Sequence, residues 1–400
     1  MKIYHQLGHN HKWALDSYFK NNIGDGFIFS AFSFKYGKLE NGVSTYKPDQ
    51  YLGKSMVDLQ FYGSKKTVGG QLESYPFNPI NLNHSDSTMV AGTELIAKAI
   101  TYQESLGLKN IIIPVFYHEA SDFGKFEKYL NKINKIIVRR KDKGSTSKYF
   151  MTVPFSNSAI LNADHVEDLL QATTDMPIVF DGYYVVCDSK PGYKRKVSID
   201  YDYYENLIKI FQVLKAQGFA TIFGYSNWDA LIFASLCDID YITIGTYENL
   251  RNFNIQRFTE SQGGGPSDGW YFSEKLLNFV RAQEIKKLRR SNCLDLIAND
   301  KNIFSEIILN KDYVWNTHKP DVHKNYLLAI SRLLEETASI ASVSKRAVFV
   351  KKKIAKARQL YGELASRKVF LYDESGDYHL GAWDSIIKMH ATHLERAHLA

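Results

Sequence analysis

The sequence predicts a (β/α)8 barrel followed by a mainly helical C-terminal region. Eight short apolar or aromatic runs alternate with helical patterns over residues 1–290, and no G-x-G-x-x-G turn follows any of them. Continuously apolar runs are typical of parallel strands that are covered on both faces. Eight such strands with intervening helices favour a closed barrel over an open doubly wound sheet.

The expected strands are rich in β-branched and aromatic residues, and polar groups follow most of them. They cover residues 2–7, 26–34, 55–62, 110–117, 148–155, 177–186, 220–225 and 241–245. The helical patterns cover roughly 12–21, 88–106, 122–140, 163–172, 201–217 and 228–236, and a further helix is expected at 271–290. Gly107 and Gly218 follow two of these patterns, at the position where a left-handed glycine often ends a helix.

Residues 291–400 have a different pattern. Helical periodicity occurs at 321–341, 343–366 and 381–397, and a hairpin is expected at 368–383. Residues 291–320 are expected to form a linker or a small subdomain. We therefore divide the chain into a barrel of residues 1–290 and a helical C-terminal region of residues 291–400.

The composition is that of a folded, basic protein. Hydrophobic residues make up 44% and charged residues 23% of the 400 residues, which excludes a disordered chain. The formal net charge is +7, with clusters at 139–143, 194–196, 286–290 and 345–358. This excess favours an anionic partner such as a nucleic acid or a nucleotide, although each cluster alone can equally be a solvated face.

The cysteine pattern and the hydropathy indicate a soluble, cytoplasmic protein. Cys187, Cys237 and Cys293 have no C-x-x-C spacing, which is typical of reduced thiols. No apolar run reaches the ~18–20 residues that span a bilayer, and the amino-terminal residues have no apolar signal region. We expect no membrane contact and no cofactor.

Catalytic groups in such barrels lie where strands end, because the loops that follow converge over one mouth. The candidates at the expected strand ends are His5, His9, Gln60, Tyr62, His118, Glu119, Asn157, Asp181, Tyr225, Asn227, Glu248 and Arg251. Tyr62, Tyr225 and Trp228 are expected to stack on a ring of the substrate.

Three carboxylates among these candidates could carry the chemistry. Asp181, Glu248 and Glu119 could supply a general acid and a nucleophile or base, as glycosyl transfer requires. Arg251 could bind a phosphate group through two hydrogen bonds. The alternatives are that a glutamate at a helix start serves the helix dipole, and that an aspartate in an apolar strand has a structural partner.

A metal site is not expected. His9-Asn10-His11 has the H-x-H form that metal-dependent hydrolases use after a first barrel strand. Those hydrolases also need histidines after later strands, but here Asn157 follows the fifth strand and Asp181 lies in the sixth. His5, His9 and His118 are expected to donate hydrogen bonds to the substrate.

Two stretches resemble the tRNA-guanine transglycosylase family. "DIDYITIGTYENLRNFN" (238–254) resembles the last-strand region of its barrel, and residues 291–336 resemble its zinc subdomain and following helix. The resemblance implies a barrel whose ancestral partner is a nucleic acid or a modified guanine base. Thr243 stands where that family has its aspartate nucleophile, and only Cys293 with His318 or His323 matches the zinc ligands, so no catalytic or metal residue is carried over.

The sequence leaves three hypotheses open. The first is a transferase or glycosidase of glycosidic or base-exchange type, acting on a nucleotide, a nucleic acid or a phosphorylated sugar. The second is a catalytically degenerate barrel whose basic C-terminal helices bind nucleic acid or protein in a larger assembly. The third is a homo-oligomer that associates through the apolar pattern at 325–343, which docking within the chain explains equally well.

Overall fold

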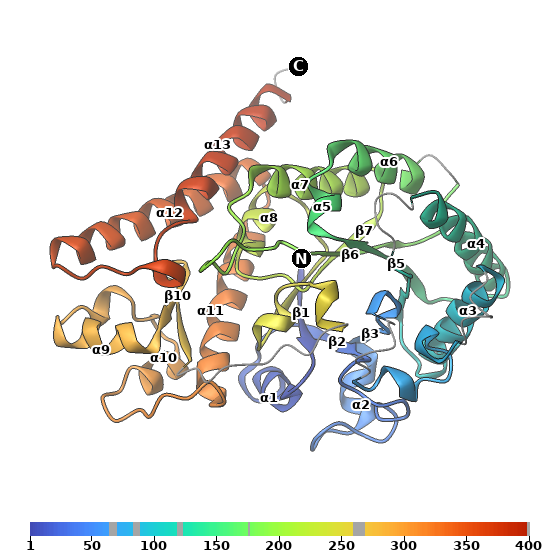
Figure 1. Cartoon of the computed structure of the whole chain (residues 1–400), viewed down its shortest axis with the longest axis horizontal. Coiled ribbons are helices and arrows are strands. Elements are labelled where there is room, and N and C mark those ends of the chain that lie inside the picture. The colour runs from blue at the N-terminus through green and yellow to red at the C-terminus, as the bar shows by residue number, and fades with distance from the viewer. Residues whose placement is uncertain (64–69, 83–88, 118–122, 175–176, 259–268, 398–400) are drawn as a thin grey trace.

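Eight parallel strands form a nearly closed barrel with helices around its outside (Figure 1), which confirms the predicted fold class. The computed structural model describes residues 1–400 except 64–69, 83–88, 118–122, 175–176, 259–268 and 398–400. The strand order is β3-β2-β1-β8-β7-β6-β5-β4. The end strands β3 and β4 lie beside each other without pairing, which leaves one seam in the ring.

The strands match the predicted order, with differences at their ends. They are β1 Lys2–Leu7, β2 Gly26–Ser30, β3 Ser55–Asp58, β4 Asn110–Ile113, β5 Lys148–Phe155, β6 Gly182–Cys187, β7 Ala220–Gly224 and β8 Tyr241–Gly245. The sixth strand begins at Gly182 rather than at residue 177, so Asp181 precedes it. This shift decides at which end of the barrel Asp181 lies.

The helices of the barrel are amphipathic and bury one face against the sheet. They are α1 His11–Asn21, α2 Pro48–Tyr51, α3 Met89–Ser105, α4 Phe123–Asp142, α5 Asn157–Ile160, α6 Ala163–Thr174, α7 Tyr201–Ala216 and α8 Ala230–Leu236. In α4, Phe126, Leu130 and Ile137 are buried at helical spacing, while most of its lysines and arginines face outward. No helix in the described part of the chain is long and apolar enough to cross a lipid bilayer.

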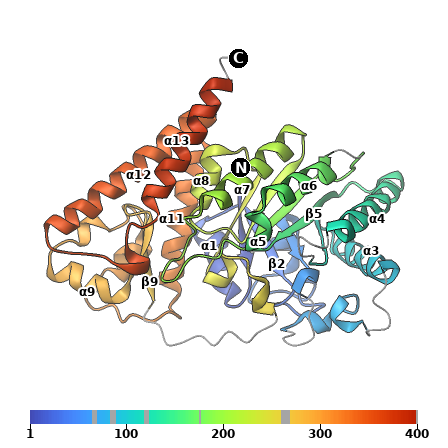
Figure 2. The same cartoon turned by 45° about the horizontal axis from the view of Figure 1, so that its top comes forward.

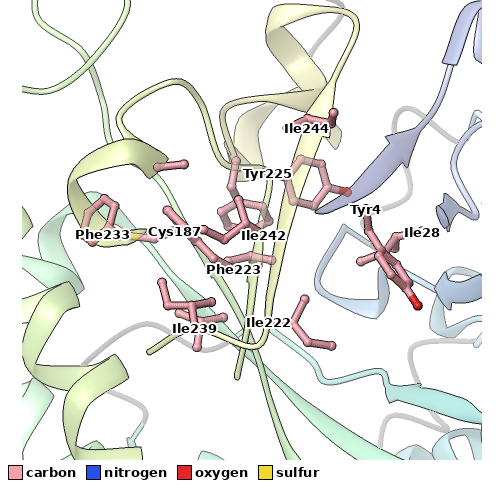
Figure 3. Close-up of a cluster of buried hydrophobic side chains, with 14 of the residues drawn as sticks. Tyr4, Ile28, Cys187, Ile222, Phe223, Tyr225, Phe233, Ile239, Ile242 and Ile244 are labelled. Carbon is pink, nitrogen blue, oxygen red and sulfur yellow. The ribbon is translucent and has the colours of Figure 1, made fainter. Parts of the chain in front are cut away.

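The barrel core is formed by side chains on both faces of the strands (Figure 3). On the outer face, Phe223 of β7 packs against Phe233 of α8, with 5.1 Å between ring centroids. On the inner face, Phe150 of β5 meets Tyr241 of β8 edge-on at 6.0 Å. Because β5 and β8 are not neighbours, this contact crosses the interior, which is filled with side chains and is not a pore.

The prediction of one helix over 271–290 is wrong. Trp270–Ser273 (β9) and Asn278–Arg281 (β10) form an antiparallel hairpin, and the helix α9 covers only Ala282–Arg290. Phe272 and Phe279 of the two strands pack on Tyr326, with centroids 5.1 and 5.2 Å from its ring. Aromatic packing in the tertiary structure therefore overrides the helical periodicity.

The C-terminal region is helical, as predicted, with α10 Ile303–Ile308, α11 Pro320–Ala338, α12 Val343–Ser366 and α13 Leu380–Ala397. The hairpin predicted at 368–383 is wrong, because no strand forms there and α13 begins at Leu380. The amide of Asn278 donates to the carbonyls of Glu374 and Gly376 at 3.0 and 2.6 Å. These side-chain bonds satisfy backbone groups that a hairpin would otherwise pair.

The C-terminal helices dock on the barrel through α7 and α8. Figures 1 and 2 place α12 and α13 together on the side of the barrel away from α3 and α4. Arg346 of α12 pairs with Asp238 at 2.5 Å, and Trp383 of α13 donates from Nε1 to the hydroxyl of Tyr204 at 2.8 Å. The apolar face of α11 is buried within the chain, so docking inside one molecule accounts for the pattern at 325–343.

Candidate active site

A buried carboxyl group, that of Asp58, lies at the carboxyl end of β3, the barrel end at which the loops after the strands begin. Oδ2 of Asp58 accepts hydrogen bonds from the hydroxyls of Tyr62, Tyr184 and Tyr225 at 2.6, 3.2 and 3.3 Å. Oδ1 accepts the backbone N–H of Gln60 at 3.1 Å. These groups come from the β3 end, from β6 and from the residue after β7. The fold therefore brings three distant segments together on one carboxyl group.

The surroundings of Asp58 raise the pKa of its carboxyl group toward neutral pH. Asp58 is 1% exposed, and burial raises its pKa to about 6, although the hydrogen bonds from Tyr62, Gln60, Tyr184 and Tyr225 favour the charged form. A carboxyl group with this pKa can both donate and accept a proton near neutral pH. A raised pKa together with several specific hydrogen-bond partners makes Asp58 a candidate functional group, although buried structural networks raise pKa values in the same way.

The backbone beside Asp58 adopts an uncommon conformation at two positions. Gln60 and Tyr225 both have φ of 53°, in the left-handed region that side chains other than glycine rarely adopt. Nε2 of Gln60 donates to the Tyr225 hydroxyl at 2.6 Å, and Oε1 of Gln60 accepts the Phe32 N–H at 2.7 Å. Backbone strain of this kind concentrates at functional sites, where it fixes the direction of a side chain.

The hydrogen-bonded network continues across the barrel interior. The Tyr184 hydroxyl lies 3.4 Å from Oε1 of Gln6 in β1, and Nε2 of Gln6 donates to Oγ of Ser30 in β2 at 3.1 Å. A Cβ at position 224 would lie 2.3 Å from the Tyr184 ring. Gly224 therefore leaves the space in which Tyr184 reaches Asp58.

A cation lies beside this cluster. The guanidinium of Arg257 is 5.5 Å from the ring centroid of Tyr225 and 4.9 Å from that of Phe258. Burial and the Asp58 charge raise the pKa of Tyr225 to about 12, although Arg257 opposes this shift. The hydroxyl of Tyr225 thus stays protonated and can donate to the carboxylate.

A cavity of about 200 Å³ opens between the loop after β8 and the C-terminal region. Its lining residues are Thr246, Tyr247, Glu248, Arg251, Trp270, Phe279, Thr317, Val322, His323 and Tyr326. The guanidinium of Arg251 lies 4.7 Å from the Phe279 ring centroid and 4.5 Å from that of Tyr326. Burial raises the pKa of Tyr326 to about 12, although the charge and a hydrogen bond of Arg251 lower it, so the two side chains contact each other. An acceptor group of a ligand could bind the Arg251 guanidinium in this cavity.

Glu248 and Lys196 form an ion pair at this cavity, with 2.8 Å between Oε2 and Nζ. Nζ of Lys196 also lies 4.2 Å from the ring centroid of Trp270. Burial raises the pKa of Glu248, but the charge and hydrogen bond of Lys196 outweigh it, so the pKa is lowered. The polar residues after β8 therefore place an ionised carboxylate and a guanidinium at the cavity.

The structure places several predicted site residues at the mouth. Gln60, Tyr62 and Tyr225 surround Asp58, and Glu248 and Arg251 line the cavity. Phe253, two residues after Arg251, packs against Tyr62 and Tyr225 with centroid distances of 5.1 and 5.7 Å. The residues around Asp58 and the cavity lined by Glu248 and Arg251 are therefore neighbours.

Asp181 lies at the opposite end of the barrel from Glu248. It precedes β6, accepts the Tyr149 N–H at 2.9 Å and pairs with Lys141 at 3.1 Å. Glu248 follows β8, and all eight strands are parallel. The expectation that Asp181 and Glu248 share one mouth is wrong, because the sixth strand starts after Asp181.

Two further predictions need correction. His5 is buried outside the mouth, where one ring nitrogen bonds the Ile23 carbonyl at 2.7 Å and burial lowers the pKa to about 4. Its ring stacks on Phe27. Trp228 is 2% exposed and packs on Phe279 at 5.1 Å, so it belongs to the core and does not present a free face for stacking.

The remaining candidates have other surroundings. His9 is exposed in the turn after β1. Nδ2 of Asn157 donates to the Asp188 carbonyl at 3.3 Å, and Nδ2 of Asn227 donates to the Lys196 carbonyl at 3.1 Å. His118 and Glu119 lie outside the described residues.

Sequence reasoning missed Asp58, Tyr184 and Lys196. Asp58 follows the apolar run Ser55-Met56-Val57, and its position as the last strand residue is the signal that could have identified it. Tyr184 stands in the middle of an apolar strand and Lys196 in a charged segment, so their contacts depend on the tertiary structure.

Two buried carboxyl groups make stability depend on pH. Burial raises the pKa of Asp229, just before α8, to about 7, although backbone N–H groups there lower it, and that of Asp58 is about 6. Folded molecules then bind more protons than unfolded ones between about pH 4 and 7, so both groups destabilise the fold as pH rises through this window.

We expect Asp229→Asn to raise the free energy of unfolding at pH 7.5 by on the order of 2 kcal/mol, with little change at pH 4. Denaturation in urea at both pH values measures this. Asp16→Asn is the matched control with the opposite sign, because Lys12, Tyr46 and Lys20 lower the pKa of Asp16 to about 2 despite its burial. A loss of stability at pH 7.5 in Asp229→Asn would contradict the linkage.

The residues that the transglycosylase resemblance relates to zinc do not fit a metal site. Sγ of Cys293 donates to the Ser291 carbonyl at 3.1 Å, and the two ring nitrogens of His323 each lie 2.7 Å from a backbone carbonyl, to one of which the ring donates. Among the described residues, no group of three or more histidine, cysteine, aspartate or glutamate side chains could hold a metal ion. No family model matches the sequence, and neither does any curated protein.

Proposed function

We propose that this protein is an enzyme of glycosidic or base-exchange type, with Asp58 as its reacting carboxyl group. A nucleotide, a nucleic acid or a phosphorylated sugar is the proposed substrate. One observation carries the proposal: a buried carboxyl group at the carboxyl end of β3 accepts hydrogen bonds from three tyrosine hydroxyls, and burial raises its pKa to about 6. The resemblance of residues 238–254 to the transglycosylases concerns the barrel architecture more than the activity.

The chemistry needs two carboxyl groups. Cleavage of a glycosidic bond needs a proton for the leaving group and negative charge beside the sugar ring as positive charge develops on it. Asp58 in its protonated form supplies the proton, and the ionised Glu248 at the neighbouring cavity is the candidate for the charge. The hydroxyls of Tyr62, Tyr184 and Tyr225 hold the Asp58 carboxyl group in one orientation.

The cations around the mouth support an anionic substrate. Arg257 lies beside the Asp58 cluster, and Arg251 lines the neighbouring cavity. Two aromatic rings hold the Arg251 guanidinium in place, so little side-chain freedom is lost when it binds a phosphate.

Arg251→Gln is expected to weaken binding of a phosphorylated ligand about 10- to 100-fold, since a hydrogen bond to a charged group is worth about 1.5–3 kcal/mol. Binding of the same ligand without its phosphate should change little. Isothermal titration calorimetry with the two ligands measures this. Arg139→Gln, on an exposed position of α4, is the control. Equal losses for both ligands would contradict a phosphate contact.

Turnover of a substrate panel tests the proposed function. The purified protein is incubated with nucleosides, nucleotides, sugar phosphates and transfer RNA, with and without free purine bases, and products are identified by mass spectrometry. Release or exchange of a base, or release of a sugar, is the expected result. Absence of product from every class would overturn the enzymatic proposal.

A second candidate function is a barrel that binds nucleic acid without turnover. It is favoured by exposed cations on α12, namely Lys345, Lys351, Lys352, Lys356 and Arg358, which form no ion pair with the described residues. Such binding would weaken steeply as salt is raised. Salt-sensitive binding together with an inert substrate panel would favour this candidate.

A further inference from the structure

A second concave surface lies between the C-terminal half of α12 and the segment before α13. This α12 groove has a volume of about 650 Å³. It is lined by Ala355, Arg358, Gln359, Tyr361, Gly362, Ala365, Val369, Phe370, Leu371, Tyr372 and Asp377. It contains none of the residues assigned above to the active site.

Two exposed aromatic rings form one wall of the α12 groove. Phe370 is 45% and Tyr372 65% exposed. Their rings are nearly parallel, with 22° between the planes and 6.2 Å between the centroids. Large aromatic side chains that remain exposed in a folded protein often mark a binding surface. Two parallel rings offer faces on which flat groups can stack.

The opposite wall has small residues and cations. A Cβ at Gly362 would meet no atom within 4 Å. Ala355, seven residues earlier on the same face of α12, is exposed. Arg358 lines the groove, and Lys351 precedes it by seven residues, which places both on the same helix face. A flat ligand could therefore lie close to the helix with positive charge along it.

The nearby acidic groups are mostly neutralised. Asp373 pairs with Lys194 at 3.0 Å, Glu374 pairs with Arg281 at 2.6 Å, and Glu363 pairs with Arg367. Arg358, Lys351 and Lys352 have no such partner among the described residues. Asp377 also lines the groove and has no ion pair among the described residues, so its negative charge partly offsets Arg358, and the cations of α12 are the groups that complement a polyanion.

We propose that the α12 groove binds single-stranded nucleic acid. Unpaired bases stack on Phe370 and Tyr372, while the phosphates lie against Arg358 and Lys351. A duplex hides the faces of its bases, and an acidic peptide has few flat groups to stack, so the combination of rings and cations selects a single strand. The inference rests on the nucleic-acid class of partner proposed above and assigns that partner a site outside the barrel mouth.

Fluorescence anisotropy with a labelled 15-nucleotide single strand tests the site in the full-length protein. Phe370→Ala/Tyr372→Ala should weaken binding at least about tenfold, because stacking one base on an aromatic ring contributes about 5- to 150-fold. Arg358→Glu should weaken it and reduce its salt dependence. The controls are Tyr193→Ala, which removes another exposed ring, and Lys135→Glu on α4.

The outcomes separate this proposal from the enzymatic one. Asp58→Asn should bind the strand as wild type does, and Phe370→Ala/Tyr372→Ala should turn over a small substrate normally. Unchanged binding in Phe370→Ala/Tyr372→Ala, with an unchanged melting temperature, would overturn the groove proposal. It would also be overturned if duplex bound as tightly as single strand, if only an acidic peptide bound, or if the groove variants merely dissociated a dimer.

Discussion

Asp58→Asn is expected to lower turnover at least about 100-fold, since a positioned acid or base contributes about 10²–10⁴-fold. The amide has nearly the shape of the carboxyl group and can still accept a hydrogen bond from Tyr62. It cannot donate a proton in the relevant pH range, and it carries no negative charge. The loss should therefore appear in kcat and not only in KM.

The same substitution should leave the fold intact. Burial raises the pKa of Asp58 to about 6, so the charged form destabilises the folded state above that pH. A neutral amide removes this penalty, and the melting temperature at pH 7.5 should be unchanged or higher. Steady-state kinetics and thermal denaturation on one preparation separate catalysis from stability.

Asp181→Asn is the matched control for this experiment. Asp181 is also an aspartate next to a barrel strand, but it pairs with Lys141 at the amino end of β6. Its substitution should leave turnover within about twofold of wild type. Full activity in Asp58→Asn, or a selective loss in Asp181→Asn, would contradict the assignment of the active site to Asp58.

The fold could be predicted from sequence because its signals are repeated. Each strand is a continuous apolar run, and each helix has an amphipathic pattern, so an error in one element leaves the alternation visible. Strands β5 and β8 were predicted with their observed ends. The hairpin β9–β10 was missed because its aromatic residues satisfy a helical period as well as an extended one.

The site was harder to predict because it depends on strand ends. "PIVFDGYYVV" is apolar on both sides of Asp181, and nothing local shows that the strand starts at Gly182. A shift of five residues moves a carboxylate from one end of the barrel to the other. Asp58 has the converse problem, because only its contacts with Tyr184 and Tyr225, far away in the chain, distinguish it from a structural aspartate.

Trp383→Ala is expected to lower the free energy of unfolding by about 3–5 kcal/mol, the usual range for removing a buried tryptophan. Trp383 of α13 is 0% exposed, donates to the Tyr204 hydroxyl of α7 at 2.8 Å and packs on His379 at 4.4 Å. All residues of α8 are buried, and α11, α12 and α13 pack on this helix. Loss of the α13 contact should therefore destabilise the barrel as well as the C-terminal region.

Urea denaturation, followed by circular dichroism and by tyrosine fluorescence, measures this coupling. Trp383→Phe keeps an aromatic ring and should lose only about 1 kcal/mol with the hydrogen bond. Met389→Ala, on an exposed position of α13, should have little effect. A single transition in all variants would mean that residues 1–290 and 291–400 unfold together. The reason is that α8 packs both within the barrel and against the C-terminal helices. Two separate transitions, with only the second shifted by Trp383→Ala, would show instead that the barrel is stable without its helical partner.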